Sequence, residues 1–63
     1  MSEKRYLTER EVAEITRFAL PTLRNERHNG RGIPYIKVGR SVRYELDDVH
    51  QYMEAHRINT QRA

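Results

Sequence analysis

Basic side chains are the groups in this sequence best suited to chemistry, and they gather in its middle. Of the twelve lysine and arginine residues, ten are arginine, which holds phosphate oxygens with two donors at once, whereas lysine acts as a point charge. The segment from Arg17 to Arg43 has seven basic residues against one acidic residue, Glu26, and so carries a net charge of +6, while the remainder carries −3. This distribution favours a nucleic acid as partner, and a merely solvated charged face is the alternative.

The other reactive side chains show no catalytic or metal-binding pattern. His28, His50 and His56 include no pair at i, i+4 on one helix face, the spacing at which two histidines bind one metal ion. Asp47 and Asp48 resemble a pair of catalytic carboxylates, but their place at a helix start explains them as capping residues. We therefore expect no enzyme activity, no metal site and no cofactor.

Length and composition limit the kind of protein further. Sixty-three residues, 37% of them hydrophobic, form one small domain over residues 1–63, and a chain this short buries only about 60% of its unfolded surface. The absence of cysteine excludes a disulfide framework. The sequence has no apolar run of membrane-spanning length, and its start lacks the apolar core of a signal peptide. The expected location is the cytoplasm, at the nucleoid, with no membrane partner.

Two short helices are predicted in the first half of the chain. Thr8 and Glu11 have the spacing of a capping box, and Leu7 and Val12 have that of a hydrophobic staple, so a helix should run from here to about Thr16. Its buried stripe is expected to contain Val12, Ala13 and Ile15.

A second helix should begin after about three residues, with Pro21 in its first turn and Asn29-Gly30 at its end. Its core-facing residues are expected to be Leu20 and Leu23, with Phe18 filling the space between the helices. Two helices joined by a tight turn form a helix-turn-helix, whose second helix enters the major groove of DNA.

The second half of the chain predicts a β-hairpin and one more helix. The runs Tyr35–Val38 and Val42–Tyr44 flank Gly39-Arg40, which favours a two-stranded hairpin. One face of the hairpin should carry Ile36, Val38, Val42 and Tyr44, and the other Lys37 and Arg43. The last helix should start at Asp47 as N-cap and place Val49, Tyr52, Met53 and His56 on one face.

These elements together predict an α+β fold of the winged helix-turn-helix class. In that fold a short helix-turn-helix is followed by a two-stranded β-hairpin wing and a C-terminal helix. We expect an ordered core over about residues 6–57 and a flexible tail over residues 58–63, because the tail is polar and lacks periodicity.

Several segments also carry a family resemblance. They are Tyr6-Leu7-Thr8, Glu11-Val12-Ala13, Thr22-Leu23-Arg24-Asn25, the run Gly32–Tyr44 (GIPYIKVGRSVRY) and Asp48-Val49. Over roughly residues 6–56 the chain is similar to the small excisionase-like winged-helix proteins of phages and integrative elements, a branch of the MerR-like superfamily. The resemblance implies DNA binding through the second helix and the wing, either by a small phage regulator or by a recombination directionality factor. The latter acts in several copies and directs an integrase of the tyrosine recombinase type.

The chain departs from that family at three positions. Arg17 and Ala19 stand where the family usually has a glycine and then a serine N-cap, and Glu26 stands where it often has a tryptophan. The lost serine cap should weaken the start of the second helix by about 1 kcal/mol. Glu26 should place a carboxylate near the DNA side of that helix or its edge.

Candidate DNA contacts on the second helix follow from its outward positions. Arg24 has the donors to pair with guanine O6 and N7, and Asn25 can pair with adenine N6 and N7; phosphate contact or plain solvation are the alternatives. Thr22 is expected to touch a phosphate near the helix start. Arg27 either joins these contacts or lies along the wing as a structural arginine, and His28 completes the outward set.

Candidate contacts on the wing are Lys37, Arg40, Ser41 and Arg43. Arg40 at the tip should grip phosphate or enter the adjacent minor groove, Ser41 adds a hydroxyl donor, and Lys37 and Arg43 should clamp phosphates on either side. A purely structural hairpin turn is the alternative for the tip.

The expected function is sequence-specific binding of double-stranded DNA. The favoured role is that of an excisionase that bends attachment-site DNA in several self-associating copies. A small phage or prophage transcriptional regulator of the same fold is the alternative. A protein-interaction or antitoxin-like module is less favoured, and the acidic first helix, with Glu9, Glu11 and Glu14, would be its surface.

Overall fold

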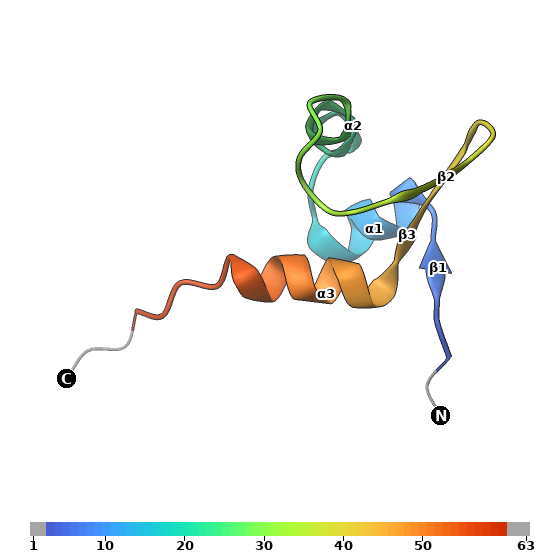
Figure 1. The fold of residues 1–63 in the computed structure, drawn as a ribbon. Coiled ribbons are helices and arrows are strands. Elements are labelled where there is room, and N and C mark those ends of the chain that lie inside the picture. Colours follow the sequence, from blue (N-terminus) through green and yellow to red (C-terminus); the bar gives the residue numbers. More distant parts are fainter. Residues whose placement is uncertain (1–2, 61–63) are drawn as a thin grey trace.

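Residues 3–60, which a computed structural model describes, form three helices and a three-stranded antiparallel sheet (Figure 1). In chain order the elements are β1 (Tyr6–Leu7), α1 (Glu9–Thr16), α2 (Leu20–His28), β2 (Ile36–Val38), β3 (Ser41–Glu45) and α3 (Leu46–Ala55). The fold is a small α+β domain of helix-turn-helix type, as expected. Residues 58–60 form neither helix nor strand, and the rest of the predicted tail, 61–63, lies outside the described residues.

The helix-turn-helix forms for the local reasons that the sequence indicates. The Glu11 amide donates to Thr8 Oγ1 at 3.2 Å and the Thr8 amide donates to Glu11 Oε1 at 2.8 Å, which confirms the capping box. Arg17 ends α1 in the left-handed region, with φ 65°. Ala19 caps α2 without a side-chain hydrogen bond. The turn thus uses a left-handed arginine and an uncapped helix start.

Arg17→Gly is expected to raise the free energy of unfolding by up to about 1 kcal/mol, because glycine adopts a positive φ without the Cβ penalty. Urea unfolding followed by circular dichroism measures the change. Arg10→Gly is the matched control: Arg10 lies exposed inside α1, where glycine destabilises by about 1 kcal/mol. Equal destabilisation by both substitutions would contradict the conformational argument.

The hairpin has a register that the sequence prediction had wrong. Gly39, with φ 61°, and Arg40 form a two-residue turn, so Lys37 pairs with Val42 and Ile36 pairs with Arg43. Paired residues of antiparallel strands lie on the same face. Lys37 therefore shares the inner face with Val42, whereas Arg43 shares the outer face with Ile36, which is exposed. With a two-residue loop, each odd-numbered residue of β2 pairs with an even-numbered residue of β3, so the two lie on the same face. The prediction instead placed the even-numbered residues of both strands on one face.

The sheet has one strand more than the predicted two-stranded hairpin. β1 pairs with β3, Tyr6 with Glu45 and Leu7 with Tyr44, so the strand order is β1-β3-β2. A two-residue strand shows no alternation of its own, and its partner lies far along the chain, so no local pattern indicates it.

The last helix begins earlier than predicted. α3 starts at Leu46, its N-cap is Glu45 without a side-chain hydrogen bond, and Asp47 and Asp48 lie in its first turn. The Leu46 amide donates to the Arg5 carbonyl at 2.9 Å. This hydrogen bond extends the pairing between β1 and β3 to the first residue of α3. The prediction of Asp47 as N-cap was therefore wrong, although both aspartates still suit the positive end of the helix dipole.

The hydrophobic core lies where the helices meet the inner face of the sheet. Its buried residues are Leu7, Val12, Leu23, Ile33, Tyr44 and Val49, and the partly buried residues packed on them are Ala13, Phe18, Leu20, Val42, Leu46 and Tyr52. The placement of Phe18 agrees with its predicted role between the helices. Ile15, Met53 and His56 are exposed, so the predicted stripes of α1 and α3 were each too wide.

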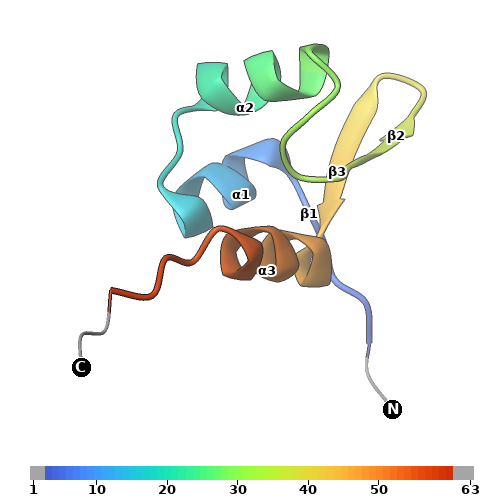
Figure 2. The ribbon, with the colours of Figure 1, turned by 60° about the vertical axis from the view of Figure 1, so that its left-hand side comes forward.

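The helices and the hairpin divide the molecule into two sides (Figure 2). In both ribbon views α2 and the hairpin tip rise on one side, α3 and the two ends of the chain lie on the other, and α1 runs between them. Within residues 3–60 no helix is long and apolar enough to cross a membrane.

Candidate nucleic-acid interface

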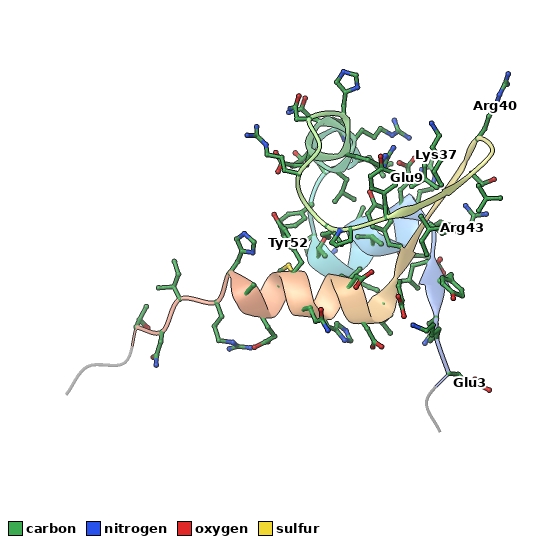
Figure 3. All side chains as sticks on the ribbon, in the orientation of Figure 1. Glu3, Glu9, Lys37, Arg40, Arg43 and Tyr52 are labelled. Atoms are coloured by element: carbon green, nitrogen blue, oxygen red, sulfur yellow. The ribbon has the colours of Figure 1, made fainter. Side chains whose placement is uncertain are left out.

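An open groove separates α2 from strand β2 and collects much of the predicted DNA-binding set. Its helix side is formed by Pro21, Arg24, Asn25 and His28, and its strand side by Tyr35 and Lys37. Lys37 reaches the groove because the register turns it to the inner face of the hairpin, towards α2 (Figure 3). Arg27 also lines the groove, so five predicted residues meet there, together with Pro21 and Tyr35, which were not among the predicted DNA contacts.

The hairpin tip forms a second exposed basic region. Arg40 projects from the turn away from the core (Figure 3). Ser41 and Arg43 line a hollow with Arg40, bounded on the other side by Thr8 and Arg10 near the start of α1. Arg43 Nη1 donates to the Val42 carbonyl at 2.8 Å. Lys37 and Arg43 leave the hairpin on opposite faces, so the shared outward face predicted for them was wrong, while their phosphate contacts stay a prediction.

Arg24 is held by a carboxylate from the first helix. Its Nε donates to both oxygens of Glu9 at 3.2 Å, and its Nη2 donates to Glu9 Oε2 at 2.6 Å. The hydrogen bond from Arg24 lowers the pKa of Glu9, against a smaller opposing effect of desolvation. The same bond raises the pKa of Arg24. Both groups are therefore charged at neutral pH, and Arg24 enters the groove already paired.

Arg27 is the structural arginine of the helix. Its Nη1 donates to the Tyr44 hydroxyl at 2.8 Å and its Nη2 donates to Glu9 Oε1 at 3.4 Å. Its guanidinium lies over the Tyr35 ring, 5.6 Å from the centroid. The side chain is 18% exposed, so Arg27 supports the groove from below and lies against the hairpin, the second of its two predicted placements.

Thr22 and Glu26 lie outside the groove. Thr22 lines a separate, mainly apolar hollow of about 230 Å³ with Phe18, Leu23 and Ile33. Glu26 also faces this hollow, and its carboxylate pairs with Arg31 at 3.6 Å. Glu26 thus lies beside the groove and not in it, and the carboxylate expected near the DNA side or its edge stays a prediction. The carboxylate that reaches Arg24 and Arg27 is that of Glu9, which the sequence predicted to be part of the acidic surface of the first helix.

Glu9 and Tyr35 lie at this site but were not among the predicted DNA contacts. The signal for Glu9 is its position as the first residue of α1, next to the capping box, where a packed second helix can bring an arginine within reach. Among residues 3–60 no group of three or more histidine, cysteine or acidic side chains could hold a metal ion. The chemistry of the site is thus that of arginine, lysine, amide and hydroxyl donors, which suits phosphate and base edges.

Comparison with known proteins agrees with this geometry. The sequence profile of the helix-turn-helix domain matches residues 6–57, nearly the whole chain. Searches of curated proteins and of solved structures give no significant match. The matched range runs from β1 to just beyond α3 and so includes α2, the hairpin and the groove between them. The chain belongs to the helix-turn-helix domain family, which implies a DNA partner and a binding rather than an enzymatic role.

Proposed function

We propose that this chain binds double-stranded DNA sequence-specifically, with α2 in the major groove and the hairpin tip on the flanking backbone or in the adjacent minor groove. The observation that carries the proposal is the projection of α2 and the hairpin from one side of the molecule, with basic side chains on both. An α-helix with its side chains is about 10–12 Å across, which fits a major groove about 12 Å wide.

The residues divide by the contact that their position allows. Arg24 and Asn25 lie on the groove side of α2 and are proposed to read bases, while His28 and Lys37 flank them and meet phosphates. Arg27 acts from beneath by fixing α2 against the hairpin. Thr22 is exposed in the first turn of α2, beside the groove, and it is proposed to contact a phosphate from there.

The hairpin residues are proposed to contact the DNA backbone. Arg40, Ser41 and Arg43 line one hollow beside the start of α1. Arg40 stands farthest from the core and enters the minor groove or grips a phosphate. Ser41 and Arg43 contact the strand that passes along the outer side of the hairpin.

The size of the chain supports a role in several copies. A single recognition module buries only about 600–1,000 Å² of protein surface on DNA, so one copy binds modestly and neighbouring copies are needed for occupancy. With the excisionase resemblance over residues 6–56, this favours a factor that bends attachment-site DNA and directs an integrase. Transcriptional regulation by the same surface is the alternative. An excision assay with the cognate integrase decides between them, because equal excision with and without this protein would reject the directionality role.

Arg40→Ala is expected to weaken binding to all duplexes alike, about tenfold at low salt, because the tip touches backbone that carries no sequence information. Fluorescence anisotropy on the preferred and on unrelated duplexes measures the effect. Arg57→Ala is the matched control: it removes the same charge beyond α3, where Arg57 pairs with Glu54, on the side away from α2 and the hairpin tip. Equal losses in the two variants would show that net charge, and not the tip, is responsible.

A further inference from the structure

An acidic side chain lies at the centre of the most basic surface of this protein. Glu9 reaches from the first residue of α1 to Arg24 and Arg27 on α2. The pair of Glu9 with Arg24, whose side chain is 52% exposed, contributes only about 0–1 kcal/mol to stability. A carboxylate near bound DNA also repels phosphate, which would weaken binding. The arrangement therefore calls for a reason beyond stability.

The geometry of the pair leaves one edge of Arg24 open. Glu9 occupies the edge formed by Nε and Nη2. Within residues 3–60 no protein group accepts a hydrogen bond from Nη1 of Arg24. The edge formed by Nη1 and the second hydrogen of Nη2 is thus free, and the Arg24 side chain is 52% exposed at the groove. Two parallel donors on one edge match the O6 and N7 acceptors of guanine.

The Glu9 carboxylate is itself fixed in place. It is 23% exposed, and its Oε1 also accepts from Arg27 Nη2, whose Nη1 is held by the Tyr44 hydroxyl in the core. The chain of contacts from Tyr44 through Arg27 and Glu9 to Arg24 joins the buried part of β3 to a side chain in the groove. A side chain held in this way loses less conformational entropy on binding than a free one.

We propose that Glu9 is a positioning residue that makes Arg24 a reader of guanine. Glu9 orients the free edge of the Arg24 guanidinium towards the base and offsets the positive charge of Arg24. A neutral base with two aligned acceptors then competes better with a phosphate for Arg24. This inference rests on the proposed binding of DNA through α2. Removing the carboxylate frees Arg24 to bind phosphate, so sequence preference falls while binding to arbitrary DNA improves.

Selection from a random duplex pool, followed by anisotropy titrations, tests the inference. The unmodified chain should prefer guanine at one position by about 5- to 150-fold, the range that a good bidentate pair provides, and Arg24→Ala should remove this preference. Glu9→Gln keeps the side-chain length, and it should lower the guanine preference several-fold. It should also strengthen binding to unrelated duplexes and steepen the salt slope by about 0.9, as one more phosphate contact does.

Glu14→Gln is the matched control, because Glu14 is an exposed carboxylate on α1 that makes no hydrogen bond or ion pair with α2 among the described residues. It should leave the guanine preference unchanged. Three results would overturn the positioning role: a Glu9→Gln variant with intact preference and uniformly tighter binding, equal loss of preference in both glutamine variants, or a guanine preference that Arg24→Ala does not alter. If the unmodified chain shows no salt-dependent affinity for duplex DNA, the proposed function itself fails. Circular dichroism confirms that each variant is folded.

Discussion

Raising the salt concentration from about 50 mM to about 200 mM is expected to weaken binding of this chain to duplex DNA about a hundredfold. Each phosphate neutralised by a cationic side chain releases condensed counterions and adds about −0.9 to the slope of log K against log salt. Four cations line the groove or the hairpin hollow and are not held by Glu9, namely Arg10, Lys37, Arg40 and Arg43.

Four contacts give a slope of about −3.6, and a fourfold change in salt then reduces affinity by about two decades. Anisotropy titrations of one labelled duplex at four or more salt concentrations measure the slope. A neutral polymer of similar length serves as the control for non-ionic association. A slope shallower than about −2 would mean that α2 and the hairpin do not both engage the backbone, and salt-independent binding would contradict the proposed interface as a whole.

The parts of the fold that the sequence predicted correctly depend on neighbours along the chain. The capping box of Thr8 and Glu11 requires only a spacing of three residues, and the glycine at position 39 requires only a local backbone angle. The errors involve distant partners. β1 exists because Leu7 pairs with Tyr44, and α3 begins early because Leu46 continues that pairing through Arg5. No local period carries such information.

The candidate site divides in the same way. The concentration of arginines in α2 and the hairpin is visible in the sequence, and most of them are exposed in the structure. What the sequence could not supply is which arginines are available to DNA. Glu9 holds Arg24 and Arg27 from fifteen and eighteen positions away, and the hairpin register places Lys37 and Arg43 on opposite faces. Both facts follow from the packing of α1 on α2 and from the two-residue turn.

Tyr44 is the residue on which both the core and the site depend. Its side chain is 1% exposed, its strand pairs with β1 on one side and β2 on the other, and its hydroxyl accepts the hydrogen bond from Arg27. Its ring also lies 6.4 Å from that of Tyr35 at the groove. Substitutions of Tyr44 that remove the whole ring or only the hydroxyl should therefore separate the contributions of the two groups to the free energy of unfolding.

Tyr44→Ala is expected to lower the free energy of unfolding by about 3–5 kcal/mol, the loss typical of a buried aromatic ring. A domain of this length has a total of only about 3–9 kcal/mol, so much of the Tyr44→Ala population should be unfolded at 25 °C. Tyr44→Phe keeps the ring and removes the acceptor for Arg27, and it should cost about 1 kcal/mol. Urea unfolding followed by circular dichroism compares the two variants. If Tyr44→Ala unfolds cooperatively and loses no more free energy of unfolding than Tyr44→Phe, the core does not depend on this ring. A much larger loss for Tyr44→Ala would show that the ring stabilises the fold, while the hydroxyl mainly holds Arg27 in place.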